Sequence, residues 1–184
     1  MQQKKNRRGR EYLNDFRKDV NGSYLYQGSY RSYAGSMPYG RLLGLLWVLC
    51  GGALAALAAA GMVPAPGAMQ QFYVLLPYAG ALVASISVVW ALARMSRGGA
   101  RLRSYVYEET AAKLPLRCLL AGVFAALAAA GECIDVFLNG GQNAIQYAVL
   151  FAVLAAAAAI AAFAARRTIC AAVYAEESGS GREE

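Results

Sequence analysis

Residues 144–165 decide the fold, and they read AIQYAVLFAVLAAAAAIAAFAA. No charged residue interrupts this segment. A helix needs about 20 consecutive apolar residues to cross the hydrocarbon core of a bilayer. A surface helix of a soluble protein keeps a charged or polar face along its length, which this segment lacks. The segment therefore predicts a transmembrane helix.

Three more apolar segments of similar length lie before this one. The four predicted spans are 42–62, 72–92, 116–137 and 144–165. Apolar residues make up 58% of the 184 residues and charged residues 16%, against about 45–50% and about 25% in soluble proteins. We therefore expect an all-α integral membrane protein, folded as a four-transmembrane-helix bundle over residues 41–177.

Lysine and arginine residues predict the orientation of this bundle. Residues 1–41 hold nine of them, residues 93–117 hold six, and the chain after residue 165 holds three. The connections 63–71 and 138–143 hold none. Cytoplasmic loops concentrate Lys and Arg, so we expect a protein of the cell membrane with both termini in the cytoplasm.

A net charge of +7 can attract either nucleic acid or anionic lipid headgroups. The basic residues border the predicted spans, where each is attracted to anionic lipid headgroups by about 1 kcal/mol. No zinc-finger, helix-turn-helix or RNA-recognition signature accompanies them. We therefore expect anionic headgroups on the cytoplasmic side as partners, and no nucleic acid.

The cytoplasmic segments carry weaker signals. Residues 1–40 are basic and tyrosine-rich; within them, 10–20 predicts a short amphipathic helix, lying either in the membrane interface or in water. Residues 24–33 predict a β-hairpin around Gln27-Gly28, whose tyrosines serve either as an aromatic belt or as a docking surface. Residues 101–113 and 166–177 predict further helix, and residues 178–184 have the composition of a cloning linker.

The two halves of the chain resemble each other. Residues 56–61, ALAAAG, recur as residues 126–131. The second and fourth spans both begin near glutamine and end near arginine. This pattern predicts two repeated helical hairpins that insert with the same orientation.

Small residues predict how the spans pack. Lipid supplies no hydrophobic drive for helix association, so close backbone approach at small residues must do it. Glycine and alanine recur every four residues along one face of each span. The predicted packing positions are Gly51, Gly52, Ala55, Ala56, Gly80, Gly122 and Ala126.

Glu132 and Asp135 form the candidate site. They are three residues apart on one predicted helix, and so share a face. Fifteen residues separate Arg117 from Glu132, which places Glu132 about 22 Å across a core of about 30 Å. An ionisable residue at that depth indicates function. The candidate set is Glu132, Asp135, Gln142, Gln146, Ser85 and Ser87.

Two interpretations of this set remain open. In one, the carboxylates bind a cation or carry a proton at an outward-facing vestibule. In the other, they reach outer water or accept hydrogen bonds from Gln142 and Gln146.

No pattern in the chain predicts catalysis. It has no histidine, and its four cysteines form no C-x-x-C pair. We expect neither enzyme activity, nor a cofactor, nor a metal. The first hypothesis is a non-catalytic scaffold, accessory or assembly subunit that binds a protein partner or itself. The alternative is a small cation- or proton-coupled transporter or channel that uses Glu132 and Asp135.

Overall fold

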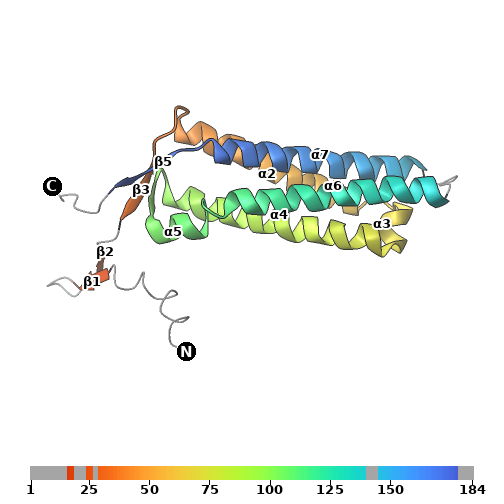
Figure 1. Ribbon diagram of the computed structural model, residues 1–184, viewed down its shortest axis with the longest axis horizontal. Coiled ribbons are helices and arrows are strands. Elements are labelled where there is room, and N and C mark those ends of the chain that lie inside the picture. Colours follow the sequence, from red (N-terminus) through yellow and green to blue (C-terminus); the bar gives the residue numbers. More distant parts are fainter. Residues whose placement is uncertain (1–15, 19–23, 27–28, 140–144, 178–184) are drawn as a thin grey trace.

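The computed structural model describes residues 16–18, 24–26, 29–139 and 145–177. Four helices in this part of the chain are long and apolar enough to cross a membrane. They are α2 (Tyr39–Gly61), α4 (Phe72–Gly98), α6 (Leu114–Asn139) and α7 (Ile145–Cys170), and they lie side by side in one bundle (Figure 1). The predicted helical bundle is confirmed. Helices α4 and α7 continue past the predicted span ends at residues 92 and 165, since the residues there still favour helix.

The four helices form a ring. Helix α2 packs against α4 and α7, and α6 packs against the same two helices. Because each connection reverses the chain, neighbours in the ring run antiparallel (Figure 1). The buried side chains become smaller from one end of the bundle to its middle. Leu46, Leu92 and Met95 fill the end. Ala53, Ala81 and Ala125 form a central cluster in the middle. Small side chains in the middle allow the helices to approach closely.

Two of the predicted packing glycines lie against aromatic rings. A methyl group added to Gly80 would lie 3.2 Å from the ring of Phe124, and one added to Gly122 would lie 3.1 Å from the ring of Phe163. Gly51 and Gly52 differ from the prediction, because a methyl group on either would meet no atom within 4 Å. Of the three alanines predicted as packing positions, Ala56 packs on the central cluster, whereas Ala55 and Ala126 are exposed.

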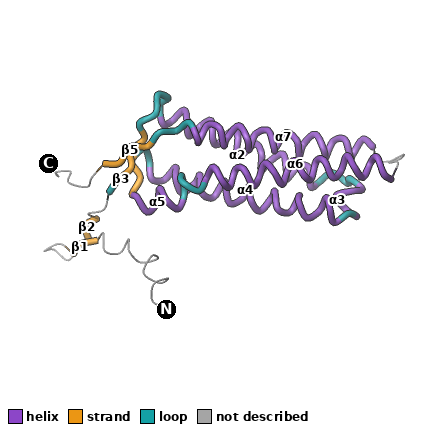
Figure 2. Tube along the Cα trace, in the orientation of Figure 1, coloured by secondary structure: helices purple, strands orange, loops and turns teal. Residues whose placement is uncertain are grey.

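A three-stranded antiparallel sheet covers one end of the bundle, here called the sheet end (Figure 2). Its central strand is β3 (Tyr30–Tyr33), flanked by β4 (Arg101–Arg103) and β5 (Tyr174–Glu177). The sheet therefore joins segments that precede α2, follow α4 and follow α7. Strands β4 and β5 occupy corresponding places in the two halves of the chain; the duplication itself stays a prediction.

This sheet corrects two helix predictions. Residues 101–103 are strand β4, and only Ser104–Glu109 forms the short helix α5. Helix α7 ends at Cys170, and residues 174–177 are strand. The cause lies at Leu102, which is buried between two exposed arginines in the alternation of a strand. Pairing with β3 satisfies the backbone that a helix would otherwise satisfy.

The N-terminal predictions are also corrected. Strand β1 (Phe16–Lys18) pairs with β2 (Tyr24–Tyr26), so residues 16–18 are not helical. The predicted pairing of residues 24–26 with 30–33 is wrong as well, because β3 pairs on both sides within the larger sheet. The rest of the predicted helix over 10–20 and the Gln27-Gly28 turn lie outside the described residues.

Four tyrosines join the sheet to the bundle. The ring of Tyr33 lies 5.7 Å from that of Tyr39 and 5.6 Å from that of Tyr174, and Tyr174 lies 5.1 Å from Tyr107. The hydroxyl of Tyr39 donates to the carbonyl of Met95 at 3.3 Å. Burial raises the pKa of the Tyr174 phenol. Tyr33, Tyr39, Tyr107 and Tyr174 are therefore part of the packing at the sheet end.

Candidate functional site at the α3 end

The opposite end of the bundle is covered by the short helix α3 (Pro66–Gln70), which connects α2 to α4 (Figure 1). Pro66 begins this helix at a position where its missing N–H costs nothing. Helix α3 contacts α4, α6 and α7. The connection is thus folded onto the bundle rather than looped away from it, and Gly67 is buried as a result.

Glu132 meets α3 from helix α6. Its side chain has 0% exposure, and its Oε1 accepts a hydrogen bond of 3.2 Å from the Gly67 N–H. No described residue donates to Glu132 Oε2. A methyl group on Gly67 would lie 2.6 Å from that oxygen, so the approach requires glycine. Within the part of the chain that the structure describes, one oxygen of this buried carboxylate therefore accepts a hydrogen bond and the other accepts none.

Asp135 lies next to Glu132 on the same face of α6. It is 4% exposed, and its Oδ1 accepts a hydrogen bond of 2.9 Å from the hydroxyl of Tyr73 in the first turn of α4. The two carboxylates thus hold two successive parts of the chain, α3 and the beginning of α4. They fix the path of the connection between α2 and α4.

The predicted hydrogen-bond partners of these carboxylates differ from the observed ones. Gln146 is exposed and Gln142 lies outside the described residues, while Gly67 and Tyr73 occupy the expected role. The interpretation that Glu132 and Asp135 reach outer water is wrong for this structure, because both are buried. Proline followed by glycine in the connection is the sequence signal that could have suggested a close approach there.

The predicted serines lie elsewhere. Ser85 is twelve residues along α4 from Tyr73, which corresponds to about 18 Å of helix. It is buried beside Cys50 and Cys118. The carbonyl of Ser87 accepts a hydrogen bond of 3.1 Å from Arg117. The structure therefore does not bring Ser85 or Ser87 to the carboxylates.

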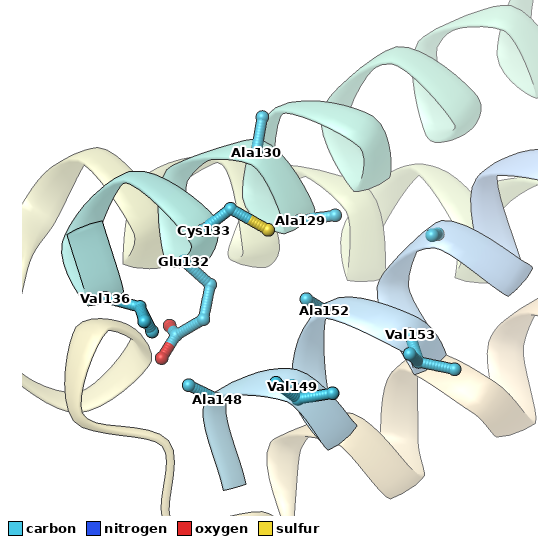
Figure 3. Close-up of a pocket in the computed structure, with 10 residues that line it drawn as sticks. Ala129, Ala130, Glu132, Cys133, Val136, Ala148, Val149, Ala152 and Val153 are labelled. Carbon is cyan, nitrogen blue, oxygen red and sulfur yellow. The ribbon is translucent and has the colours of Figure 1, made fainter. Parts of the chain in front are cut away.

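A groove of about 450 Å³ runs between α6 and α7 beside Glu132 (Figure 3). Its walls are almost entirely small or β-branched apolar side chains. The lining residues on α7 include Ala148, Ala152 and Ala156, and those on α6 include Ala129, Ala130 and Cys133. The Glu132 side chain extends from α6 toward α7, with its carboxylate between Val136 and Ala148 (Figure 3).

The surroundings of the groove limit its chemistry. Val149 and Val153 on its rim are exposed, so it opens on the outer flank of the bundle. Among the described residues, no three His, Cys, Asp or Glu side chains are grouped to hold a metal ion. The site offers one carboxylate, apolar walls and a thiol. This set suits the binding of an apolar surface that carries a hydrogen-bond donor.

No protein family, no curated protein and no solved structure matches this chain.

Proposed function

We propose that this protein is a non-catalytic accessory or assembly subunit of the cell membrane, which binds a transmembrane helix of a different membrane protein in the α6–α7 groove. The observation that carries the proposal is the groove itself: small-residue walls on the outer flank, next to a buried carboxylate oxygen without a donor. In this proposal the sheet end faces the cytoplasm, because the lysines and arginines concentrate there.

The spacing of the alanines supports a helix as the occupant. Ala148, Ala152 and Ala156 recur every four residues along α7, which covers about 12 Å or two turns. Such a ladder lets the backbone of a neighbouring helix approach closely, and dispersion contacts over that length stabilise helix pairs in lipid. A third helix laid between α6 and α7 would cover the exposed rim.

The Oε2 atom of Glu132 favours a partner helix that carries a hydrogen-bond donor. A buried polar atom without a hydrogen bond costs about 1–3 kcal/mol, and lipid offers no donor to relieve it. The side chain of Glu132 has three rotatable bonds, so Oε2 can turn toward a group docked in the groove. A Lys, Arg, Ser, Thr or Asn on the partner helix would supply the hydrogen bond.

A second copy of the chain fits this requirement poorly. In a symmetric dimer each subunit would present the same surface to its partner. The groove lining offers only the Cys133 thiol as a side-chain donor, and a thiol is a weak one. Two grooves would also bring two Glu132 carboxylates toward one another. A partner of different sequence is therefore favoured.

Site-specific photocross-linking in the native membrane tests the proposal. A photoreactive residue at Val153, on the groove rim, should give an adduct, whereas one at Val48, exposed on α2, should not. Peptide mapping should place the cross-link in a transmembrane helix of another membrane protein that bears a polar donor. Replacement of that donor, or Glu132→Ala, should reduce the adduct by at least about fivefold.

Several outcomes would contradict it. Equal adducts from Val153 and Val48 would mean that the groove is not selective. Adducts only with lipid, or only with a second copy, would remove the proposed partner. An adduct that is unchanged by Glu132→Ala and by loss of the donor would remove the role of the carboxylate.

A cation- or proton-coupled transporter is the second candidate, favoured by one observation. Glu132 is a fully buried carboxylate with one unsatisfied oxygen inside a helix long enough to span a membrane. Such residues mark ion and proton pathways in many membrane proteins. Purified protein in proteoliposomes should then show cation-dependent flux that Glu132→Gln abolishes. Absence of flux for Na⁺, K⁺ and H⁺ gradients would rule this candidate out.

A further inference from the structure

Four arginines gather at the sheet end of the bundle, outside the site described above. Arg94 and Arg97 lie one turn apart near the end of α4, and Arg101 and Arg103 lie on strand β4. Gly99, with a φ of +68°, turns the chain between these two elements. That conformation is unfavourable for other residues, and it folds β4 back toward the last turn of α4.

The arginines line a pocket of about 500 Å³. Its other walls include Tyr30 and Tyr105, and no acidic residue is among the described residues that line it. The guanidinium of Arg101 lies over the ring of Tyr30, 4.5 Å from its centroid, which holds it in place. Arg103 is on the same face of β4, because Leu102 between them points into the core.

The two arginines that α4 contributes to the pocket, Arg94 and Arg97, differ in their surroundings. Arg94 forms a salt bridge of 3.2 Å with Glu109 of α5. Arg97, one turn further, is exposed. Guanidinium groups bind phosphate oxygens through paired hydrogen bonds. A pocket with four of them fits a phosphate group.

An exposed apolar stripe on α4 leads to this pocket. Val83, Ile86 and Trp90 are all exposed, and their spacing places them on the same face as Arg94 and Arg97. Trp90 is 68% exposed one turn before Arg94. The second tryptophan, Trp47 of α2, donates to Ser96 at 3.0 Å, at the level of the pocket. Tryptophans concentrate at the boundary between acyl chains and headgroups.

From these observations we infer that the pocket binds the phosphate of an anionic phospholipid, whose acyl chain lies along Val83, Ile86 and Trp90. The order of groups on α4 matches the order of groups in a lipid: apolar stripe, indole, then guanidinium. A free phosphate or a soluble phosphomonoester would use the arginines alone. The stripe beside them therefore favours a lipid over a soluble phosphate.

Tryptophan quenching by brominated lipids tests the inference. In the variant Trp47→Phe, Trp90 is the only tryptophan left in the chain. Phosphatidylglycerol with brominated acyl chains should quench Trp90 at a mole fraction about fivefold to tenfold lower than brominated phosphatidylcholine requires. Ten millimolar inorganic phosphate should not reverse this quenching.

Matched arginine variants separate the pocket from general electrostatic attraction. In the Trp47→Phe background, Arg97→Gln with Arg101→Gln should remove the preference for phosphatidylglycerol. Arg166→Gln with Arg167→Gln, which removes the same charge from the end of α7, should keep it. Arg97→Lys with Arg101→Lys preserves the charge but not the paired hydrogen bonds, and should keep only part of the preference. If the double glutamine variant does not fold, the exposed position Arg97→Gln alone should lower the preference at least twofold.

The following results would overturn the inference. Equal quenching by the two lipids would show no headgroup selection. A preference that survives Arg97→Gln with Arg101→Gln, or falls equally in the Arg166 and Arg167 variant, would show attraction to charge in general. Displacement of the lipid by inorganic phosphate at millimolar concentration would identify a soluble phosphate as the ligand.

Discussion

Asp135 of α6 accepts a hydrogen bond of 2.9 Å from the hydroxyl of Tyr73, the second residue of α4. The acceptor is buried, whereas the tyrosine ring is half outside the bundle. One turn along α6, Glu132 holds Gly67 in the preceding helix. The two acids therefore fasten the connection that closes the α3 end.

Removal of the Tyr73 hydroxyl should loosen this end. In Tyr73→Phe, Asp135 loses the donor to Oδ1 while it stays buried, and the loss of a hydrogen bond to a buried acceptor lowers the free energy of unfolding. We expect the midpoint of thermal unfolding in detergent to fall by about 2–4 °C. Tyr147→Phe, an exposed position on α7, is the matched control and should leave the midpoint unchanged. An equal effect of both variants would contradict a specific role for the hydroxyl.

Gly67→Ala should be destabilising because of Glu132. The new methyl group would lie 2.6 Å from Oε2 and 3.0 Å from the Asp135 Cβ. Forcing a group into a filled space costs about 1–3 kcal/mol. Gly52→Ala is the control, since its methyl group would meet no atom within 4 Å, and it should be neutral or slightly stabilising.

A double-mutant cycle isolates the contact between these two residues. In a Glu132→Ala background the carboxylate is absent, so the cost of Gly67→Ala should fall by about 1 kcal/mol. It should not vanish, because the Asp135 Cβ remains. Unfolding in mixed detergent micelles gives all four free energies. A coupling energy of zero would mean that Glu132 does not approach Gly67 as closely as the structure shows.

The sequence predicts the helices better than the site, for a physical reason. An uninterrupted apolar run such as 144–165 indicates a spanning helix locally, without knowledge of its neighbours. The hydrogen bonds of Glu132 and Asp135 depend on how the connection after α2 folds back, which is a tertiary property. The local pattern favours Gln142 and Gln146, which follow the two acids closely in sequence. The observed partners, Gly67 and Tyr73, come from 65 and 62 residues away.

The sheet cannot be predicted from the sequence for a related reason. Strand β4 contains three residues, too few for alternation to be distinguished from chance. Its strand character comes from β3, which lies about 70 residues earlier in the chain. Tyrosines recur in residues 24–33, but the rings that they pack against cannot be read from this segment alone. Tyr33 packs on Tyr174 from the other end of the chain.

Leu102→Ala tests whether the sheet is a stable part of the fold. Leu102 is 1% exposed and packs in the same core cluster as Leu92 and Met95. Truncation of a buried leucine to alanine costs about 2–5 kcal/mol. Val173→Ala, exposed beside β5, should change the free energy of unfolding by less than about 0.5 kcal/mol. Hydrogen exchange should then show loss of protection in β3, β4 and β5 of the leucine variant.

Tyr174 should make stability sensitive to alkaline pH. Burial raises the pKa of its phenol above the usual value of about 10 in an unfolded chain. Its contribution is therefore fully present below pH 10, and it is lost as the pH rises from there toward the folded pKa. Thermal unfolding between pH 8 and 11 should show a smaller alkaline decline in Tyr174→Phe than in the parent chain. An identical decline would mean that Tyr174 ionises as readily in the folded state.

The orientation of the bundle can be measured at its two ends. Met62, near the α3 end, is 81% exposed, and Val173, beside β5, is 59% exposed. Single cysteines at these positions, in a chain whose four natural cysteines are replaced by alanine, report which side of the membrane each end occupies. A membrane-impermeant maleimide should label Met62→Cys in intact cells. It should label Val173→Cys only after the cells are permeabilised.

The expected asymmetry follows from charge. All 18 lysines and arginines lie outside the connections 63–71 and 138–143, and translocating basic loops is opposed during insertion. Labelling of Val173→Cys in intact cells, with Met62→Cys protected, would reverse the proposed orientation. Labelling of both positions before permeabilisation would mean that the chain inserts both ways. The reversed orientation would also move the arginine pocket to the side of the membrane with fewer anionic headgroups, where its proposed ligand is scarce.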